Sequence, residues 1–309
     1  MADQDMPIES AEDTIKRIFS SGDSTVGAEI THEFNRYSRL QEAKFPKPAR
    51  TRLIAVANQK GGVGKTTTAV NLAYVLATSC HLRVLLVDAD GQANATQILL
   101  PRGEYDGLGA LMRGMAICYD ELVVHTDVEG LDVLPASEDL WALDLEAAGG
   151  EGGRSYRTLR DMGEAVDEDG AYDVMVIDCP PNLSAACVSA ILASDAVIIP
   201  VLSDACSATG VADLMEQIDS LRYIRPEIRV AGVLVNQWHR SPVVEDAAAY
   251  LREDGRVPVY DTVIRRTDKV PESSWARMAV QQWSPWCSAA RDYRAWAAEL
   301  LTKEGLNHE

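Results

Sequence analysis

The sequence predicts an α/β protein: a single doubly wound, mostly parallel sheet flanked by helices. Apolar, β-prone runs alternate with helical patterns along most of the 309-residue chain. The runs are apolar at successive positions, as in strands buried on both faces, and strand–helix alternation is typical of a parallel sheet. Ligands of such sheets bind beyond the carboxyl ends of the strands, so polar residues directly after a run are candidate site residues. The predicted strands are residues 52–57, 84–87, 131–134, 174–177, 196–201, 230–235 and 257–263.

The composition is that of a globular protein, with 47% hydrophobic and 25% charged residues. The net charge of −18 argues against bulk attraction to nucleic acid. It allows a local basic patch, because exposed charges more than about 10 Å apart are largely screened at 0.1 M salt. The six cysteines are scattered, which favours reduced thiols over a disulfide framework, a zinc site or an iron–sulfur cluster. No apolar stretch approaches ~18 residues, so we expect a cytoplasmic protein that does not bind membrane.

Two parts of the chain differ in pattern. Residues 1–50 lack strong periodicity, and we expect them to form an N-terminal extension that is partly helical or disordered. Residues 51–309 carry the alternating pattern and form one predicted domain. The predicted C-terminal helix, residues 289–301, has one apolar face that we expect to dock onto the core.

The segment at 58–68 reads Asn-Gln-Lys-Gly-Gly-Val-Gly-Lys-Thr-Thr-Thr and lies between a predicted strand and a helical pattern. That is the context of a phosphate-binding loop, in which glycines let backbone N–H groups point at phosphate oxygens beside a helix N-terminus. Lys65 can reach the β- and γ-phosphates, and the Thr66 hydroxyl has the position that binds Mg²⁺. A glycine-rich turn without a ligand is the alternative, which two lysines and two threonines in this context disfavour. The predicted nucleotide-binding residues are Gly61, Gly62, Val63, Gly64, Lys65, Thr66 and Thr67.

Carboxylates follow two other predicted strands. Asp88 and Asp90 come directly after the run at 84–87, and Asp178 follows the run at 174–177. Near a triphosphate, such carboxylates can bind Mg²⁺ or orient a water molecule. The alternative for each is a turn or N-cap at the start of a helix. The phosphate-binding loop in the same sheet favours the functional interpretation.

Three motifs, in this order, resemble those of the ParA/MinD family of P-loop ATPases. Residues 60–66 match the deviant Walker A motif Lys-Gly-Gly-x-Gly-Lys-Thr. Residues 88–96 are similar to Asp-x-Asp-Pro-Gln-Gly-Asn-Ala-Thr, and residues 177–181 match Ile-Asp-x-Pro-Pro. The resemblance extends from residue 51 to about residue 303 and implies the fold of a P-loop NTPase of the deviant Walker A class.

Three positions depart from a usual pattern. Gln59 stands where an ordinary P-loop begins with glycine, as expected for the deviant form. In the second motif, Gly91 replaces the usual proline and Ala93 replaces the usual glycine. These two changes alter the stiffness of the loop but leave both of its carboxylates in place.

The resemblance implies hydrolysis of ATP to ADP and phosphate, with ATP and Mg²⁺ bound. Besides Lys65, the implied catalytic residues are Asp90, which helps to position the attacking water, and Lys60, which reaches the phosphates bound by a second subunit. Asn236 matches a family asparagine that hydrogen-bonds the adenine, although asparagine at a strand end is also a common turn former. The implied metal site consists of Thr66, Asp88 and Asp178.

Within the family, the resemblance is to ParA/Soj-like partition ATPases. It implies an ATP-dependent homodimer that binds DNA without sequence preference, is stimulated by a ParB-like centromere-binding partner and is nucleoid-associated. Basic residues cluster in the second half of the chain, where they form either a solvated face or contacts to the DNA backbone. The candidate DNA-binding residues are Arg222, Arg225 and Arg240. A second candidate set is Arg265, Arg266 and Lys269.

Two other functions stay open. A MinD-like spatial regulator would act on a membrane or protein cargo, but membrane targeting favours a basic amphipathic tail that residues 289–301 do not provide. A metabolic enzyme of the same fold would need grouped cysteines for a cluster or a second substrate pocket, and the pattern indicates neither. A ParB-like gene beside this one would favour partition.

Overall fold

The computed structural model describes residues 47–304 except 117, 138, 141–142, 144–155 and 203–206. The chain divides into two units, residues 1–43 and 44–309. The first unit, and with it nearly all of the expected N-terminal extension, lies outside the described residues. No helix in the described ranges is long and apolar enough to cross a membrane.

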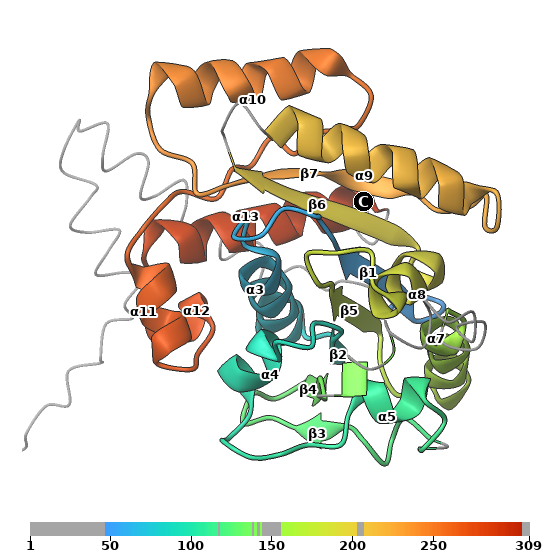
Figure 1. Ribbon diagram of the computed structural model, residues 1–309. Coiled ribbons are helices and arrows are strands. Elements are labelled where there is room, and N and C mark those ends of the chain that lie inside the picture. The colour runs from blue at the N-terminus through green and yellow to red at the C-terminus, as the bar shows by residue number, and fades with distance from the viewer. Residues whose placement is uncertain are drawn as a thin grey trace, which may run out of the picture. The chain divides into compact units, whose positions relative to one another are not determined.

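The described part of the second unit contains a seven-stranded sheet of order β3-β4-β2-β5-β1-β6-β7 (Figure 1). Every pair of neighbouring strands is parallel except β3 with β4. The predicted fold class is therefore confirmed. The strands are β1 (Arg52–Val56), β2 (Val84–Asp88), β3 (Val124–His125), β4 (Leu131–Leu134), β5 (Val174–Asp178), β6 (Ala196–Leu202) and β7 (Val230–Asn236).

The predicted strand at 257–263 is the exception, because this segment makes only an isolated bridge to β7, between Val259 and Val233. Its pairing stops where the carboxylate of Glu299 accepts the backbone N–H groups of Asp261 and Thr262, at 2.8 and 3.0 Å. A side chain 37 residues further along the chain thus takes the N–H of Thr262, which continued pairing with β7 would use. The sequence pattern of the segment itself does not show this competition.

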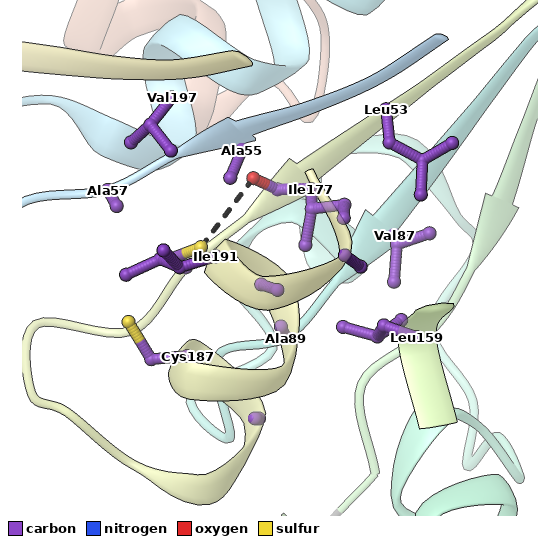
Figure 2. Close-up of a cluster of buried hydrophobic side chains, with 14 of the residues drawn as sticks. Leu53, Ala55, Ala57, Val87, Ala89, Leu159, Ile177, Cys187, Ile191 and Val197 are labelled. Atoms are coloured by element: carbon purple, nitrogen blue, oxygen red, sulfur yellow. Dashed lines mark hydrogen bonds between the residues drawn. The ribbon is translucent and has the colours of Figure 1, made fainter. Parts of the chain in front are cut away.

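Helices cover both faces of the sheet, as the doubly wound arrangement requires. Alternate residues of β1 belong to two hydrophobic clusters, so that Leu53 and Ala55 face one layer and Ile54 and Val56 the other. Figure 2 shows the first cluster, in which Ile191 lies near Ala55 of β1 and Ile177 of β5, and Leu159 lies on the side of Val87 of β2. The helices are α3 (Lys65–Thr78), α4 (Asn94–Leu99), α5 (Leu108–Met112), α7 (Thr158–Asp169), α8 (Ala185–Ala193), α9 (Ser207–Arg222), α10 (Pro242–Asp254), α11 (Lys269–Trp275), α12 (Val280–Trp283) and α13 (Ser288–Lys303).

The C-terminal helix α13 packs on the core beside α3, as its apolar face predicts. Trp296 is fully buried and makes edge contacts with Tyr260 and Tyr293, at ring-centroid distances of 5.7 and 6.3 Å. Such aromatic pairs add to the free energy gained from burial. Helix α13 therefore stabilises the domain by packing in the same hydrophobic layer, on the same face of the sheet, as α3.

Candidate nucleotide-binding site

The glycine-rich loop joins the carboxyl end of β1 to α3, as predicted from its context. Gly64 is the N-cap of α3 in a left-handed conformation (φ 87°), and no side chain caps this helix. The first N–H groups of α3 are therefore left for a ligand at the positive end of the helix dipole. A cleft with a volume of 1590 Å³ opens at this point and is lined by Gly61, Gly62, Gly64, Lys65, Thr66 and Thr67, together with Asp90 from the β2 side.

The conformation of the loop is fixed from the end of β7. The side-chain amide of Asn236 donates to the carbonyl of Val63 (3.1 Å) and to the hydroxyl of Thr68 (3.2 Å), and that of Gln237 donates to the carbonyl of Gly62 (3.2 Å). A Cβ atom on Gly64 would lie 2.5 Å from the Asn236 amide nitrogen, so only glycine fits beneath this contact. We call Asn236 and Gln237 the loop clamp. The adenine contact of Asn236 stays a prediction, because its amide is buried and bonded to the loop.

The two lysines of the motif lie in different environments. Lys65 is buried and its ammonium group donates to the carbonyl of Lys60 at 3.1 Å. Burial lowers the pKa of Lys65, while the carboxylates of Asp178 and Asp90 act in the opposite direction. Lys60 is only half-buried, and its backbone N–H is held at 2.9 Å by the side chain of Asn58. Lys65 thus lies in the cradle formed by the glycine-rich loop and the start of α3, whereas Lys60 remains partly accessible at the edge of this cradle.

Two carboxylates meet beneath the loop, because Asp88 and Asp178 pair in register at the ends of β2 and β5. Asp88 accepts hydrogen bonds from the backbone and hydroxyl of Thr96, at 2.8 and 2.7 Å. Burial raises its pKa to about 6. Among the described residues, neither buried oxygen of Asp178 has a hydrogen-bond partner. Burial and the neighbouring Asp88 hold the pKa of Asp178 well above its usual range, against the nearby Thr66 hydroxyl and Lys65.

A buried carboxylate without a partner costs free energy, and a cation beside it removes that cost. Oxygen ligands from one carboxylate and one hydroxyl, completed by phosphate and water, are what Mg²⁺ prefers in phosphate sites. Asp178 and Thr66 therefore fit the predicted ion. Asp88 is bonded to Thr96 through one oxygen and to the backbone of Asp90 through the other (3.2 Å), so its direct contact with a metal stays a prediction.

Asp90 is nearly buried and lines the cleft, where one of its oxygens accepts the backbone N–H of Gln92 at 3.0 Å. Ala93, two residues after Gly91, adopts a left-handed conformation (φ 54°) as the N-cap of α4. An L-residue there costs about 1–2 kcal/mol relative to glycine. This explains why glycine is usual at this position of the motif, and the turn still delivers Asp90 to the cleft.

The structure does not bring the three candidate DNA-binding arginines together. Arg222 pairs with Asp219 at 2.6 Å at the end of α9, near the start of β7. Arg225 is largely buried, donates to the carbonyl of Leu192, and has its pKa lowered by burial. Arg240 is exposed and follows the opposite, carboxyl end of β7.

A different basic residue lies near Arg240. The backbone of Trp238 bridges to Arg265, and the N–H of Arg266 donates to the carbonyl of Trp238 at 2.8 Å. Arg266 is exposed, whereas Arg265 binds the carboxylate of Asp292 through several hydrogen bonds of 2.6–3.1 Å. The sequence separation of Arg240 and Arg266 hides this neighbourhood, since it depends on the pairing of two distant segments.

Comparison with known proteins agrees with this geometry. A family model described as "AAA domain" matches residues 51–230. The chromosome partitioning protein ParA of Caulobacter vibrioides is 37% identical over 264 residues, covering 82% of this chain and 95% of that protein. The chromosome-partitioning ATPase Soj of Thermus thermophilus is 37% identical over 82% of this chain and 97% of its own length. A structure of cobyrinic acid a,c-diamide synthase from Mycobacterium smegmatis with bound ADP and magnesium has a TM-score of 0.69 at 30% identity, covering 82% of this chain and 96% of that one.

The parallel sheet, the glycine loop at an uncapped helix and the buried carboxylates define a P-loop ATPase. With relatives of this identity and coverage, the chain belongs to the ParA/MinD family, whose Walker A motif carries the additional lysine found here as Lys60. The predicted family, fold and ATPase activity are confirmed. Asn236 was indicated as an adenine contact, whereas its hydrogen bonds to the loop, and the contribution of Gln237, were not indicated by the motifs.

Proposed function

We propose that this ATPase is a ParA-like partition protein that uses Mg²⁺, forms a homodimer with ATP, binds DNA without sequence preference in that state and is stimulated by a ParB-like partner. It would act in the cytoplasm at the nucleoid, through a domain spanning residues 51–309. The observation that carries the nucleotide site is the cradle at α3, where an uncapped helix, buried Lys65 and unpartnered Asp178 converge. Support for partition comes from the relatives named for chromosome partitioning.

In this proposal, the loop N–H groups and Lys65 bind the β- and γ-phosphates of ATP. Thr66 and Asp178 hold Mg²⁺, which when bound supplies neutralisation of phosphate charge. Asp90 accepts a hydrogen bond from the attacking water and orients it, since its carboxylate lines the cleft beside the loop. Asp88, held by Thr96, keeps a second negative charge beneath the site.

The proposed dimer gives Lys60 its role. A lysine directed at phosphates from a second subunit stabilises transition-state charge in trans, as an arginine finger does. The half-buried position of Lys60, outside the cradle that Lys65 fills, supports this assignment. ATP then acts as a dimerisation switch, and its hydrolysis as the release step.

For DNA we infer contacts through Arg240 and Arg266 rather than through Arg222 and Arg225. The first two are exposed and lie on neighbouring segments beside the loop clamp. Arg222 and Arg225 are bonded within the chain at the other end of the sheet. Phosphate contacts need accessible positive charge and no sequence reading, which these exposed arginines provide.

A gel-shift series over salt and nucleotide tests the proposal. We expect the parent protein to shift arbitrary duplex DNA only with ATP and Mg²⁺, and the shift to weaken steeply as salt rises. Arg240→Glu should remove the shift while ATP-dependent dimerisation persists, and Arg222→Glu is the matched control that should retain it. If only Arg222→Glu abolished the gel shift, the DNA-binding site would lie at the end of α9 instead. Absence of any ATP-dependent shift at low salt would reject partition, and nucleotide-dependent vesicle binding would then favour a MinD-like function.

A further inference from the structure

Trp275, the last residue of α11, is 90% exposed, which is unusual for the largest apolar side chain. The backbone that carries it is well anchored. The guanidinium of Arg277 donates to the carbonyl of Gln97 in α4 at 2.6 Å, and the N–H of Val280 donates to the side chain of Asn71 in α3 at 2.8 Å. Figure 1 shows α11 and α12 beside α3 and α4. The exposed indole is therefore attached to a backbone segment that these hydrogen bonds hold in place.

The position of this indole relates it to the nucleotide site. Trp275 lines the same cleft as Lys65 and Asp90. Two other exposed tryptophans lie nearby in sequence, but neither lines the cleft: the indole N–H of Trp283 is bonded to Glu272 at 3.1 Å, and Trp286 is 63% exposed. Among the three, Trp275 combines the highest exposure with a place on the cleft.

We propose that Trp275 is a contact residue for a second copy of this chain in the nucleotide-bound dimer. The inference rests on the proposed function, in which Lys60 reaches phosphates held by the partner. A two-fold dimer uses the same surface on both subunits, so each cleft mouth must then face the other subunit. A tryptophan that is 90% exposed and lines this cleft is then covered when the subunits meet.

An apolar contact would offset part of the charge repulsion between two subunits. Each subunit carries a net charge of −18, so two copies repel one another at low salt. Large aromatic side chains that become buried near the centre of an interface contribute the most binding free energy. As salt rises it screens both this repulsion and the attraction of Lys60 to the partner's phosphates, but it leaves the apolar contact of Trp275 in place. DNA binding by the same protein should weaken over the same range.

The test measures dimerisation by sedimentation velocity with Mg²⁺ and a non-hydrolysable ATP analogue, over a series of protein concentrations. Trp275→Ala should raise the dimer dissociation constant at least about 30-fold, the effect of losing an interface hot spot. Trp275→Phe should restore much of the affinity, and Trp286→Ala should stay within a few-fold of the parent. Binding of a fluorescent ADP analogue to dilute monomer, and thermal unfolding without nucleotide, should be unchanged in Trp275→Ala.

The outcomes separate the two proposals. If the parent protein forms no dimer with the ATP analogue, the proposed function fails first. If the parent dimerises and Trp275→Ala does so within threefold of it, the role of Trp275 is overturned while the proposed function stands. Weakened binding of the ADP analogue to the Trp275→Ala monomer would overturn the proposed dimer contact of Trp275 in favour of a contact to the nucleotide base. Equal weakening of the dimer by Trp286→Ala would overturn it as non-specific.

Discussion

Replacement of Asn236 tests whether the end of β7 holds the phosphate loop. Asn236 is 3% exposed, and Asn236→Ala removes the two hydrogen bonds that its amide donates, to the Val63 carbonyl and the Thr68 hydroxyl, and the weaker one that its oxygen accepts from the N–H of Gln237 at 3.3 Å. Two such bonds contribute about 0.5–1.5 kcal/mol each, and leaving the buried carbonyl unsatisfied costs about 1–3 kcal/mol. We expect the free energy of unfolding to fall by about 2–4 kcal/mol. Asn236→Asp, which keeps the volume but turns a donor into an acceptor facing the carbonyl, should be at least as destabilising.

The assay combines urea unfolding with two ligands. A loose loop weakens the binding of both ATP and inorganic triphosphate, whereas a lost adenine contact weakens only that of ATP. For the clamp we expect both affinities to fall by about tenfold or more, equivalent to 1.4 kcal/mol. Gln237→Ala tests the exposed member of the clamp for comparison: its bond to the Gly62 carbonyl lies at the surface and should contribute only about 0.5–1 kcal/mol. A change below 0.5 kcal/mol for Asn236→Ala, with triphosphate binding intact, would refute the clamp and support the adenine contact.

Three further predictions concern charged groups. Lys65→Ala should abolish ATP binding in a fluorescence titration, because loop amides alone face uncompensated phosphate charge; affinity within a few-fold of the parent would contradict this. Asp90→Ala should slow phosphate release while Mg·ATP still binds. Asp178→Asn should instead reduce the gain in ATP affinity that Mg²⁺ gives. The same variant should stabilise the nucleotide-free protein against urea, because it removes an unpartnered buried carboxylate. Equal loss of ATP binding in both variants would show that the two roles are assigned wrongly. Arg83→Met should lower stability at neutral pH by about 1 kcal/mol. Burial raises the pKa of Asp173, but the hydrogen bonds from Arg83 outweigh burial and make the pKa lower than usual. A depressed folded-state pKa stabilises fully above the unfolded value of about 3.9, so in urea titrations the difference between variant and parent should shrink as pH falls below that value and disappear once pH passes the lower, folded-state pKa of Asp173.

The parts of this structure that sequence predicts are those governed by local pattern. Six apolar runs became strands because they are buried on both faces, and the glycine loop formed where a strand meets a helix. The segment at 257–263 did not, because Glu299 takes its backbone donors. The sequence of a segment does not show which distant side chain will accept hydrogen bonds from its N–H groups. The same limit applies to Asn236, whose partners in the loop are 168 and 173 residues away.

The arginines show how chain direction decides which charges can act together. Because α9 runs back along the sheet, Arg222 ends beside the start of β7, while Arg240 follows its end. The two are separated by a seven-residue strand, or roughly 20 Å at 3.3 Å per residue. Pairing of Trp238 with Arg265, in contrast, brings Arg266 beside the segment that carries Arg240. Sequence indicates that basic residues are present, and topology selects which of them share a surface.

This placement bears on how nucleotide would control DNA binding. Arg240 lies four residues after Asn236 and three after Gln237, so the basic segment continues directly from the loop clamp. Two arginines on a chain of net charge −18 attract duplex DNA weakly, whatever the position of the loop. A dimer presents four, and affinity rises steeply with the number of phosphates neutralised together. In the proposed dimer, pairing of two subunits would therefore by itself be enough to make DNA affinity depend on nucleotide.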